Sequence, residues 1–182
     1  MKGVVFTEFL EMVEEAHGIE FVDVLTSLSE LHSGGAYTSV GNYPHEDMLA
    51  MVGKLSEMID VPPKDLVTTF GKYLFKAFSK NYSVFFEGIT SSIQLLEGIE
   101  AVIHTEVRKL YPEASLPTFD CFSDDRGLVM DYSSDKPFAD LAEGLIQACI
   151  SHFADDYQIH REEGPTGDAH SSRFVISKVS TP

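Results

Sequence analysis

Apolar residues recur at helical spacing through the first two-thirds of the chain. Four segments show this pattern, and they span residues 1–17, 45–59, 63–80 and 89–111. In each segment, apolar positions three or four residues apart form one face of a helix, and charged residues lie on the other face. A further apolar segment, 19–31, precedes a loop with a Gly pair and a Pro. The pattern predicts a helical lobe over residues 1–111.

The pattern changes after residue 111 to short, alternating segments rich in β-forming residues. These segments span residues 116–124, 126–134, 156–163 and 171–179. Turn residues separate the first two segments, and the last two segments would be joined by a turn between 163 and 170. An amphipathic helix over 137–153 lies between the two pairs of segments. We therefore expect a single α+β domain, 1–182. Its helical lobe would pack on an antiparallel four-stranded sheet, residues 112–182, crossed by one helix.

Composition and charge exclude several classes of protein. The chain has 182 residues and 43% hydrophobic content, which is too apolar for a disordered protein. Its formal net charge of -16 repels nucleic acid and anionic membrane surfaces at long range. Glu8 and Glu11 interrupt the apolar start, so a signal peptide is not expected. Two separate cysteines, and the lack of an apolar run of about 18 residues, favour a cytoplasmic protein.

His104 is the histidine whose position is hardest to explain as a simple surface residue. In the helix over 89–111, one apolar face would be formed by Leu95, Leu96, Ile99, Val102, Ile103, Val107 and Leu110. His104 lies off this face with Ala101 and Tyr111, where it could simply be solvated. This helix comes last in the helical lobe, however, and its second face could turn toward the sheet, where a cleft could hold a ligand. A neutral imidazole there could bind a metal.

Three hydrogen-bond donors alternate just before the helix at 137–153. Tyr132, Ser134 and Lys136 would share one face of a strand, because successive side chains point to opposite sides. They could form the polar face of an edge strand, or they could bind an acceptor-rich anion such as a pair of carboxylates. The sequence contains no nucleophile motif, phosphate-binding loop or dinucleotide fingerprint, so an enzyme is not expected.

Four segments resemble the bacterial H-NOX family, the haem nitric oxide/oxygen binding domains related to the sensor domain of soluble guanylate cyclase. These segments are "MKGVVFTEFLEMV", "GIEAVIHTEVRKLYPEASLP", "YSSDK" and "AEGLIQ". The resemblance implies that haem b lies between the lobes with His104 as its proximal ligand. It also implies that Tyr132 and Ser134 match two of three positions in a Tyr-x-Ser-x-Arg motif that holds the haem propionates. Lys136 replaces the arginine, which keeps the charge but loses the planar fork, and Asp135 would point to the opposite face. A proline matching Pro117 would press on the macrocycle.

The resemblance also bears on which gas the domain would bind. Oxygen-binding members have a distal tyrosine where this chain has Leu141, and dioxygen depends on such a donor more than nitric oxide does. The apolar distal pocket would be lined by Val5, Phe9, Leu74, Phe78, Leu141 and Leu145. Some relatives carry a structural zinc site, of which only His160 remains here. The other zinc-ligand positions hold Phe138, Asp140 and Ser171, so no zinc is expected.

The resemblance implies a sensor of nitric oxide that also binds carbon monoxide. Nitric oxide would break the His104–iron bond, and the domain would signal to a sensor histidine kinase or a cyclic-di-GMP enzyme. One alternative is a haem-free, small-molecule-binding sensor of the vinyl-reductase-like type. A second is a haem enzyme, such as a peroxidase or a nitric oxide dioxygenase. That chemistry needs polar distal groups, which Leu74, Phe78 and Leu141 do not supply.

Overall fold

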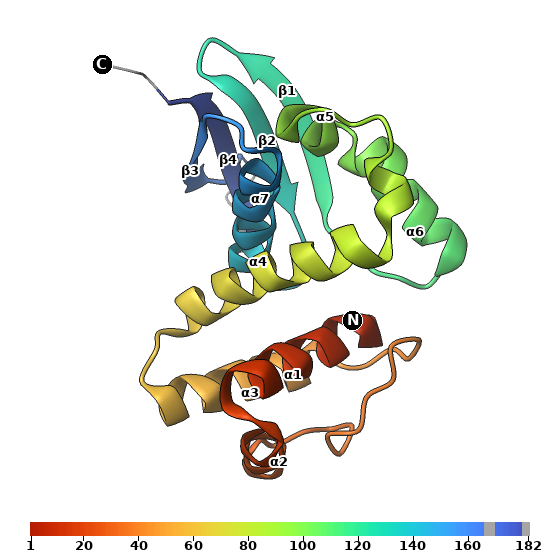
Figure 1. Ribbon diagram of the computed structural model, residues 1–182, viewed down its shortest axis with the longest axis vertical. Helices are drawn as coiled ribbons and strands as arrows, with labels where there is room; N and C mark the ends of the chain where they lie inside the picture. The colour runs from red at the N-terminus through yellow and green to blue at the C-terminus, as the bar shows by residue number, and fades with distance from the viewer. Residues whose placement is uncertain (166–169, 180–182) are drawn as a thin grey trace.

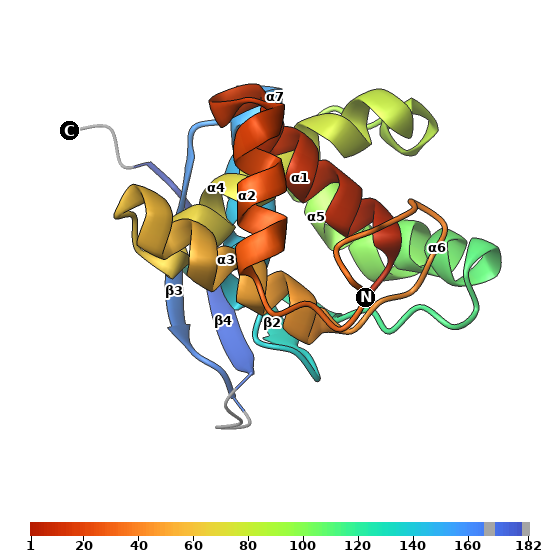
Figure 2. The same ribbon diagram turned by 90° about the horizontal axis from the view of Figure 1, so that it is seen from below.

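The expected helices are present in the computed structural model, which describes residues 1–165 and 170–179 (Figure 1). Their bounds are Gly3–His17 (α1), Ile19–Leu28 (α2), His45–Ile59 (α3), Pro63–Asn81 (α4) and Ala139–Phe153 (α7). The predicted loop lies between α2 and α3, and a short 3-10 helix, Ser83–Phe86 (η1), follows α4. In Figure 1, α1, α2 and α3 lie below α4, and Figure 2 shows these three helices from below, with α2 in contact with both α1 and α3.

The single helix predicted over 89–111 is divided into three pieces. They are α5 (Ser92–Glu97), a π-helical segment Ile99–His104 (η2) and α6 (Thr105–Leu110). A π turn is wider than an α turn and shifts the angular phase of all later residues. Val102 and Leu110 are consequently 50% and 62% exposed, so the apolar face predicted from α periodicity is wrong at these two positions.

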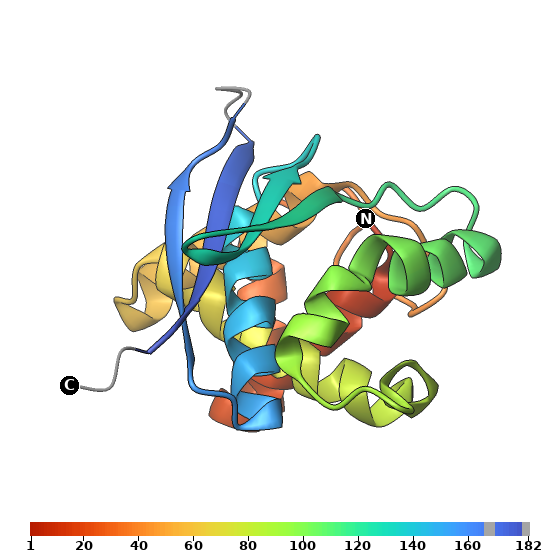
Figure 3. The same ribbon diagram turned by 90° about the horizontal axis from the view of Figure 1, so that it is seen from above.

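The four predicted strands form one antiparallel sheet in the order β1-β2-β4-β3. The strands are Thr118–Asp124 (β1), Gly127–Ser133 (β2), Tyr157–Glu163 (β3) and Ser171–Lys178 (β4). The β1–β2 turn closes at Gly127, where φ is +135° and an added Cβ would lie 2.2 Å from the Ile176 carbonyl oxygen. The turn expected over 163–170 lies partly outside the described residues. With α7 packed along this sheet (Figure 3), the predicted α+β fold is confirmed.

Two hydrophobic cores meet along α4 and α7. The first joins α1, α2 and α3 to α4, and the second joins the sheet to α5 and α7. Leu145 of α7 packs against both cores. Leu95 and Leu96 belong to the sheet's core although they precede residue 111. The interface between α4 and α7 therefore controls how the two halves of the molecule are placed.

Two glycines let the backbones of α4 and α7 touch where these helices cross. A Cβ on Gly71 would lie 2.4 Å from the Leu141 carbonyl oxygen, and a Cβ on Gly144 would lie 2.1 Å from that of Thr68. Both distances are too short for any side chain, and each clash is with backbone rather than with a flexible group. The close crossing brings Leu74 of α4 and Leu141 of α7 into the same core.

We expect Gly144→Ala to lower the free energy of unfolding by about 2–3 kcal/mol, because the two helices must separate. Gly53→Ala is the matched control, since Gly53 lies within α3 and an added Cβ there meets nothing within 4 Å. That variant should be stabilised by roughly 0.5–1 kcal/mol, because alanine is the better helix former. Urea denaturation measures both values. Equal effects of the two variants would contradict the close crossing.

A buried carboxylate holds the loop between α2 and α3. Asp47, in the first turn of α3, is 0% exposed. Its Oδ1 accepts from the His32 backbone N–H at 2.8 Å and lies 3.0 Å from His32 Nδ1. Its Oδ2 accepts from Ser33 N–H at 3.0 Å, from Ser33 Oγ at 2.5 Å and from the Tyr37 hydroxyl at 3.2 Å. One side chain therefore fixes most of the loop's path.

Candidate cofactor site

His104 is half-buried at the junction between the π-helical segment and α6. Its side chain is 12% exposed, and its Nδ1 lies 2.8 Å from Glu100 Oε1. Glu100 also accepts from the Phe119 backbone N–H at 3.0 Å and from Arg108 at 3.3 Å. A carboxylate bound at Nδ1 fixes the tautomer and the ring orientation, and it leaves Nε2 as the nitrogen able to bind a metal.

The electrostatics of this pair favour a neutral imidazole. Burial lowers the pKa of His104 below its ordinary value, although Glu100 acts in the opposite direction. For Glu100, burial would raise the pKa, but hydrogen bonds from His104 and the Phe119 N–H outweigh it and lower the pKa. The neutral imidazole is the form that binds metals. Sequence reasoning missed Glu100, although its spacing four residues before His104 in a helix could have indicated it.

Of the three alternating donors Tyr132, Ser134 and Lys136 (the donor motif), only the first lies on a strand. Tyr132 is buried on β2, opposite Phe119 of β1, but β2 ends at Ser133. Ser134 and Lys136 therefore lie in the connection to α7, and the expected strand alternation over all three residues is wrong. Ser134 Oγ accepts from the Lys136 backbone N–H at 3.1 Å, which closes a turn that ends the strand.

The connection also brings Asp135 to the same side as Lys136, so the expectation that Asp135 faces the opposite way is wrong. Lys136 Nζ lies 2.8 Å from Asp135 Oδ1 and 2.6 Å from Ser115 Oγ, and its side chain is 13% exposed. Burial raises the pKa of Tyr132, and a hydrogen bond with Ser134 acts in the opposite direction. Pro117 is half-buried directly before β1, two residues from Ser115. The donors and the proline therefore share one end of the sheet.

A surface pocket links the His104 pair to the donor motif. It encloses about 360 Å³, and its lining includes Glu100, Phe119 and Tyr132. Phe119 also bridges the two groups by ring contacts, at 6.0 Å from His104 and 5.4 Å from Tyr132. The structure thus brings together residues that are 28 positions apart in the sequence.

The six residues expected to line an apolar pocket belong to one core. Phe9 and Leu74 are buried, while Val5, Phe78, Leu141 and Leu145 are partly buried against the same cluster. Two tyrosines also pack there, but their hydroxyls are engaged, Tyr37 with Asp47 and Tyr43 with Thr38. The role of the six predicted residues in lining a distal pocket remains a prediction.

The positions that correspond to zinc ligands in some relatives have different surroundings in this structure. His160 is exposed on β3, Phe138 is buried in the first core, and Asp140 pairs with Arg161 at 2.5 Å. Among residues 1–165 and 170–179, no group of three His, Cys, Asp or Glu side chains could hold a metal ion. In the same residues, no helix is both long and apolar enough to cross a membrane.

The donor set fits haem b. A neutral imidazole with a free Nε2 suits the iron, two hydroxyls and an ammonium suit the propionates, and an apolar core suits the macrocycle. The fold and the site therefore suit a haem-binding domain.

Comparison with known proteins places this domain in a family. The family model for haem-NO-binding domains (HNOB) matches residues 2–161. The chain is 36% identical to the Fe(II) unliganded H-NOX protein from K. algicida, with a TM-score of 0.89 and coverage of 100% of this chain and 98% of that chain. It is 40% identical to the IWP-051-bound H-NOX from Shewanella woodyi in the Fe(II)CO state, with a TM-score of 0.82 and coverage of 98% and 95%.

A third structure gives the same result at lower identity. The H-NOX protein from S. oneidensis in the Fe(II)NO state is 26% identical, with a TM-score of 0.89 and coverage of 99% of this chain and 100% of that chain. No curated protein matches the chain. The chain belongs to the H-NOX family of haem-based gas sensors, and the expected cofactor, haem b, agrees with this assignment. H-NOX domains are sensor domains that are not catalytic by themselves.

Proposed function

We propose that this chain senses nitric oxide with haem b bound to His104 and signals to a separate effector protein. Haem held by His104 would supply ferrous iron able to bind nitric oxide, and the proposed response is release of His104 from the iron. The observation that carries the proposal is the half-buried His104, held through Nδ1 by Glu100. A carboxylate in this position orients the ring and raises the basicity of the ligating nitrogen.

The remaining site residues would hold the cofactor from its edges. Tyr132, Ser134 and Lys136 would bind the propionates, and Pro117, at the same end of the sheet, would press on the macrocycle. Lys136 replaces an arginine fork with a single ammonium, so one aligned hydrogen bond is lost, at a cost of about 1 kcal/mol. Haem would therefore be bound somewhat more weakly than with arginine at this position.

Leu141 supports discrimination against dioxygen. Dioxygen on ferrous iron is polarised and is stabilised by a hydrogen-bond donor, whereas nitric oxide binds strongly without one. Leu141 offers no donor, and the hydroxyls of Tyr37 and Tyr43 in the same core already have partners. Nitric oxide and carbon monoxide are thus the proposed ligands.

The output would begin at the junction that carries His104. Once released from the iron, His104 would no longer fix the start of α6, and the helix could shift against the sheet. Two packings with different ligand affinities are sufficient to transmit the signal. A sensor histidine kinase or a cyclic-di-GMP enzyme is the proposed effector, as the family resemblance implies.

The direct experiment is an absorption spectrum of the reduced protein before and after nitric oxide is added. We expect a haem Soret band that moves to shorter wavelength when His104 is released, and a smaller change with carbon monoxide. A purified protein with no Soret band, even after haem is supplied, would contradict the proposal. Rapid turnover of peroxide would instead indicate a haem enzyme.

Leu141→Tyr should introduce binding of dioxygen to the reduced protein. A new hydrogen bond of about 1–2 kcal/mol corresponds to roughly a tenfold gain in affinity. Leu141→Phe is the matched control, because it adds a similar ring without the hydroxyl. Reduced samples of both variants would be titrated with dissolved oxygen and followed by their visible spectra. If both rings have the same effect, position 141 does not face the bound gas.

A further inference from the structure

Lys2 occupies a socket formed by two distant parts of the chain. Its Nζ donates to the Val40 carbonyl at 2.9 Å and to Glu113 Oε1 at 3.1 Å, and it lies 4.3 Å from the centre of the Tyr111 ring. The Lys2 side chain is only 10% exposed. A lysine is rarely so buried unless its charge is paired, so these contacts are a built feature rather than a casual surface pair.

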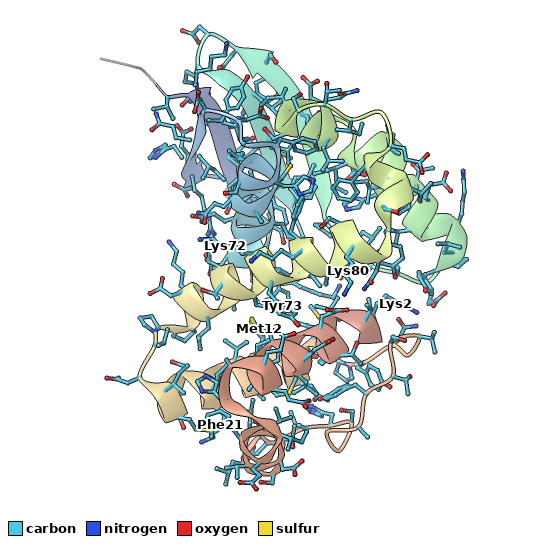
Figure 4. The ribbon with its side chains drawn as sticks, viewed as in Figure 1. Lys2, Met12, Phe21, Lys72, Tyr73 and Lys80 are labelled. Carbon is cyan, nitrogen blue, oxygen red and sulfur yellow. The ribbon has the colours of Figure 1, made fainter. Side chains whose placement is uncertain are left out.

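The backbone of Lys2 is attached to the N-terminal helices and to the loop between α2 and α3. Lys2 forms a β-bridge with Asn42, and the Gly3 N–H donates to the Gly41 carbonyl at 2.8 Å. A Cβ on Gly3 would lie 1.8 Å from the Thr38 carbonyl oxygen, so the start of α1 is pressed directly onto the 38–43 loop. The backbone of Lys2 is therefore fixed, and its side chain extends from the start of α1 (Figure 4).

The other side of the socket belongs to the helix that carries His104. Tyr111 ends α6, and its N–H donates to the Val107 carbonyl at 2.8 Å. Glu113 follows two residues later and also accepts from Asn42 Nδ2 at 3.1 Å. Its own backbone N–H, Asn42 and Lys2 together lower the pKa of Glu113, so it is ionised at neutral pH. His104 and Tyr111 stand at opposite ends of α6, about 10 Å apart along its axis.

We propose that Lys2 and Glu113 are positioning residues for His104, because they anchor the far end of α6 to the N-terminal helices and oppose its displacement. This inference rests on the proposed function. In the resting protein the anchor resists movement of α6 away from the position that His104 requires. After His104 is released, the Lys2 socket must either open or draw the N-terminal helices along with α6. It therefore sets how readily the helix moves and carries the movement across the molecule.

The test compares two variants of the anchor with a control on α6 itself. Lys2→Met removes the ammonium and keeps the stem, and Glu113→Gln keeps an acceptor but removes the charge. Glu106→Gln is the control, because Glu106 pairs with Lys109 within α6 at 2.5 Å and reaches no other element through that pair. Glu113→Gln keeps the test open if Lys2→Met folds poorly, since Glu113 is mostly exposed.

Two measurements on the haem-loaded protein decide the question. Hydrogen–deuterium exchange of residues 105–111 in the resting protein should be about fivefold faster in both anchor variants and unchanged in Glu106→Gln. Nitric oxide should alter exchange of the 38–43 loop in the unmodified protein but not in the anchor variants, a change that a merely stabilising pair would not control. The spectral step that reports release of His104 should also be about fivefold faster in the anchor variants.

The outcomes separate the two proposals. If the unmodified protein shows no spectral response to nitric oxide, the proposed function fails. If it responds, but the anchor variants match Glu106→Gln in exchange and in rate, the anchoring role of Lys2 and Glu113 is wrong. If all three variants speed exchange of residues 105–111 equally, the effect does not depend on the contact between Lys2 and Glu113, and the inference is also overturned.

Discussion

Replacing His104 with glycine is expected to abolish stable retention of haem in buffer without imidazole. The iron would lose its proposed protein ligand, while Glu100 would keep its hydrogen bonds from the Phe119 N–H and Arg108. Outer partners of a metal ligand alone change affinity by about 10–100-fold, so loss of the ligand itself should exceed that range. The rate of haem transfer to excess apomyoglobin measures the effect.

Free imidazole should restore haem binding to His104→Gly, because it can enter the space left by the side chain and ligate the iron. The nitric oxide response of the rescued protein should then lack any movement of α6, since the imidazole is not tethered to the chain. His160→Gly is the matched control, because His160 is exposed on β3 and should leave haem transfer unchanged. Equal haem loss from both variants, or none from either, would remove His104 from the site.

Asp47→Ala should lower the free energy of unfolding by about 3 kcal/mol, because the half-buried donors of Ser33 and Tyr37 lose their acceptor. Glu46→Ala is the control. Glu46 neighbours Asp47 in the first turn of α3, but its side chain is 56% exposed, so its loss should cost under about 1 kcal/mol. Urea denaturation at neutral pH compares the two. A cost for Asp47→Ala no larger than that for Glu46→Ala would contradict the role of the buried carboxylate.

The pH dependence of stability should also report the contribution of the Asp47 carboxylate. Burial would raise the pKa of Asp47, but hydrogen bonds from Ser33 and the His32 N–H outweigh it and hold the pKa well below its ordinary value. A depressed pKa means that the carboxylate stabilises the fold fully above about pH 4 and that this contribution is lost as the pH falls further. The unmodified protein should therefore lose stability on acidification more steeply than Asp47→Ala.

The sequence predicted most of the fold because most of its elements are locally consistent. Helices α3 and α4 begin at proline or acidic positions and keep one apolar stripe, and the β1–β2 turn requires Gly127. The π turn before His104 was not predicted, because α periodicity assumes a constant angle per residue. The face assigned to Val102 and Leu110 was wrong for that reason.

The site was predictable in its residue types but not in its partners. His104 and Tyr132 could be selected from spacing and resemblance, whereas the Glu100 contact with the Phe119 N–H depends on how β1 packs beside the π segment. Ser134 and Lys136 were expected on a strand because alternation in sequence does not show where pairing ends. Lys136 contacts Ser115, which lies 21 positions earlier in the sequence on the far side of the β1–β2 hairpin, and no local pattern encodes this contact.

The backbone contact between Gly71 and Gly144 has a mechanical consequence. Two helices whose main chains already touch cannot move closer, and sliding would drive one carbonyl into the other helix. Leu74 and Leu141 therefore lie on two helices that cannot easily move relative to each other. The wall that these two residues would form in the proposed distal pocket should keep its shape whether or not a gas is bound. Gas selectivity would then be a property of individual side chains on this wall, which single substitutions can alter without loosening the contact between the two helices.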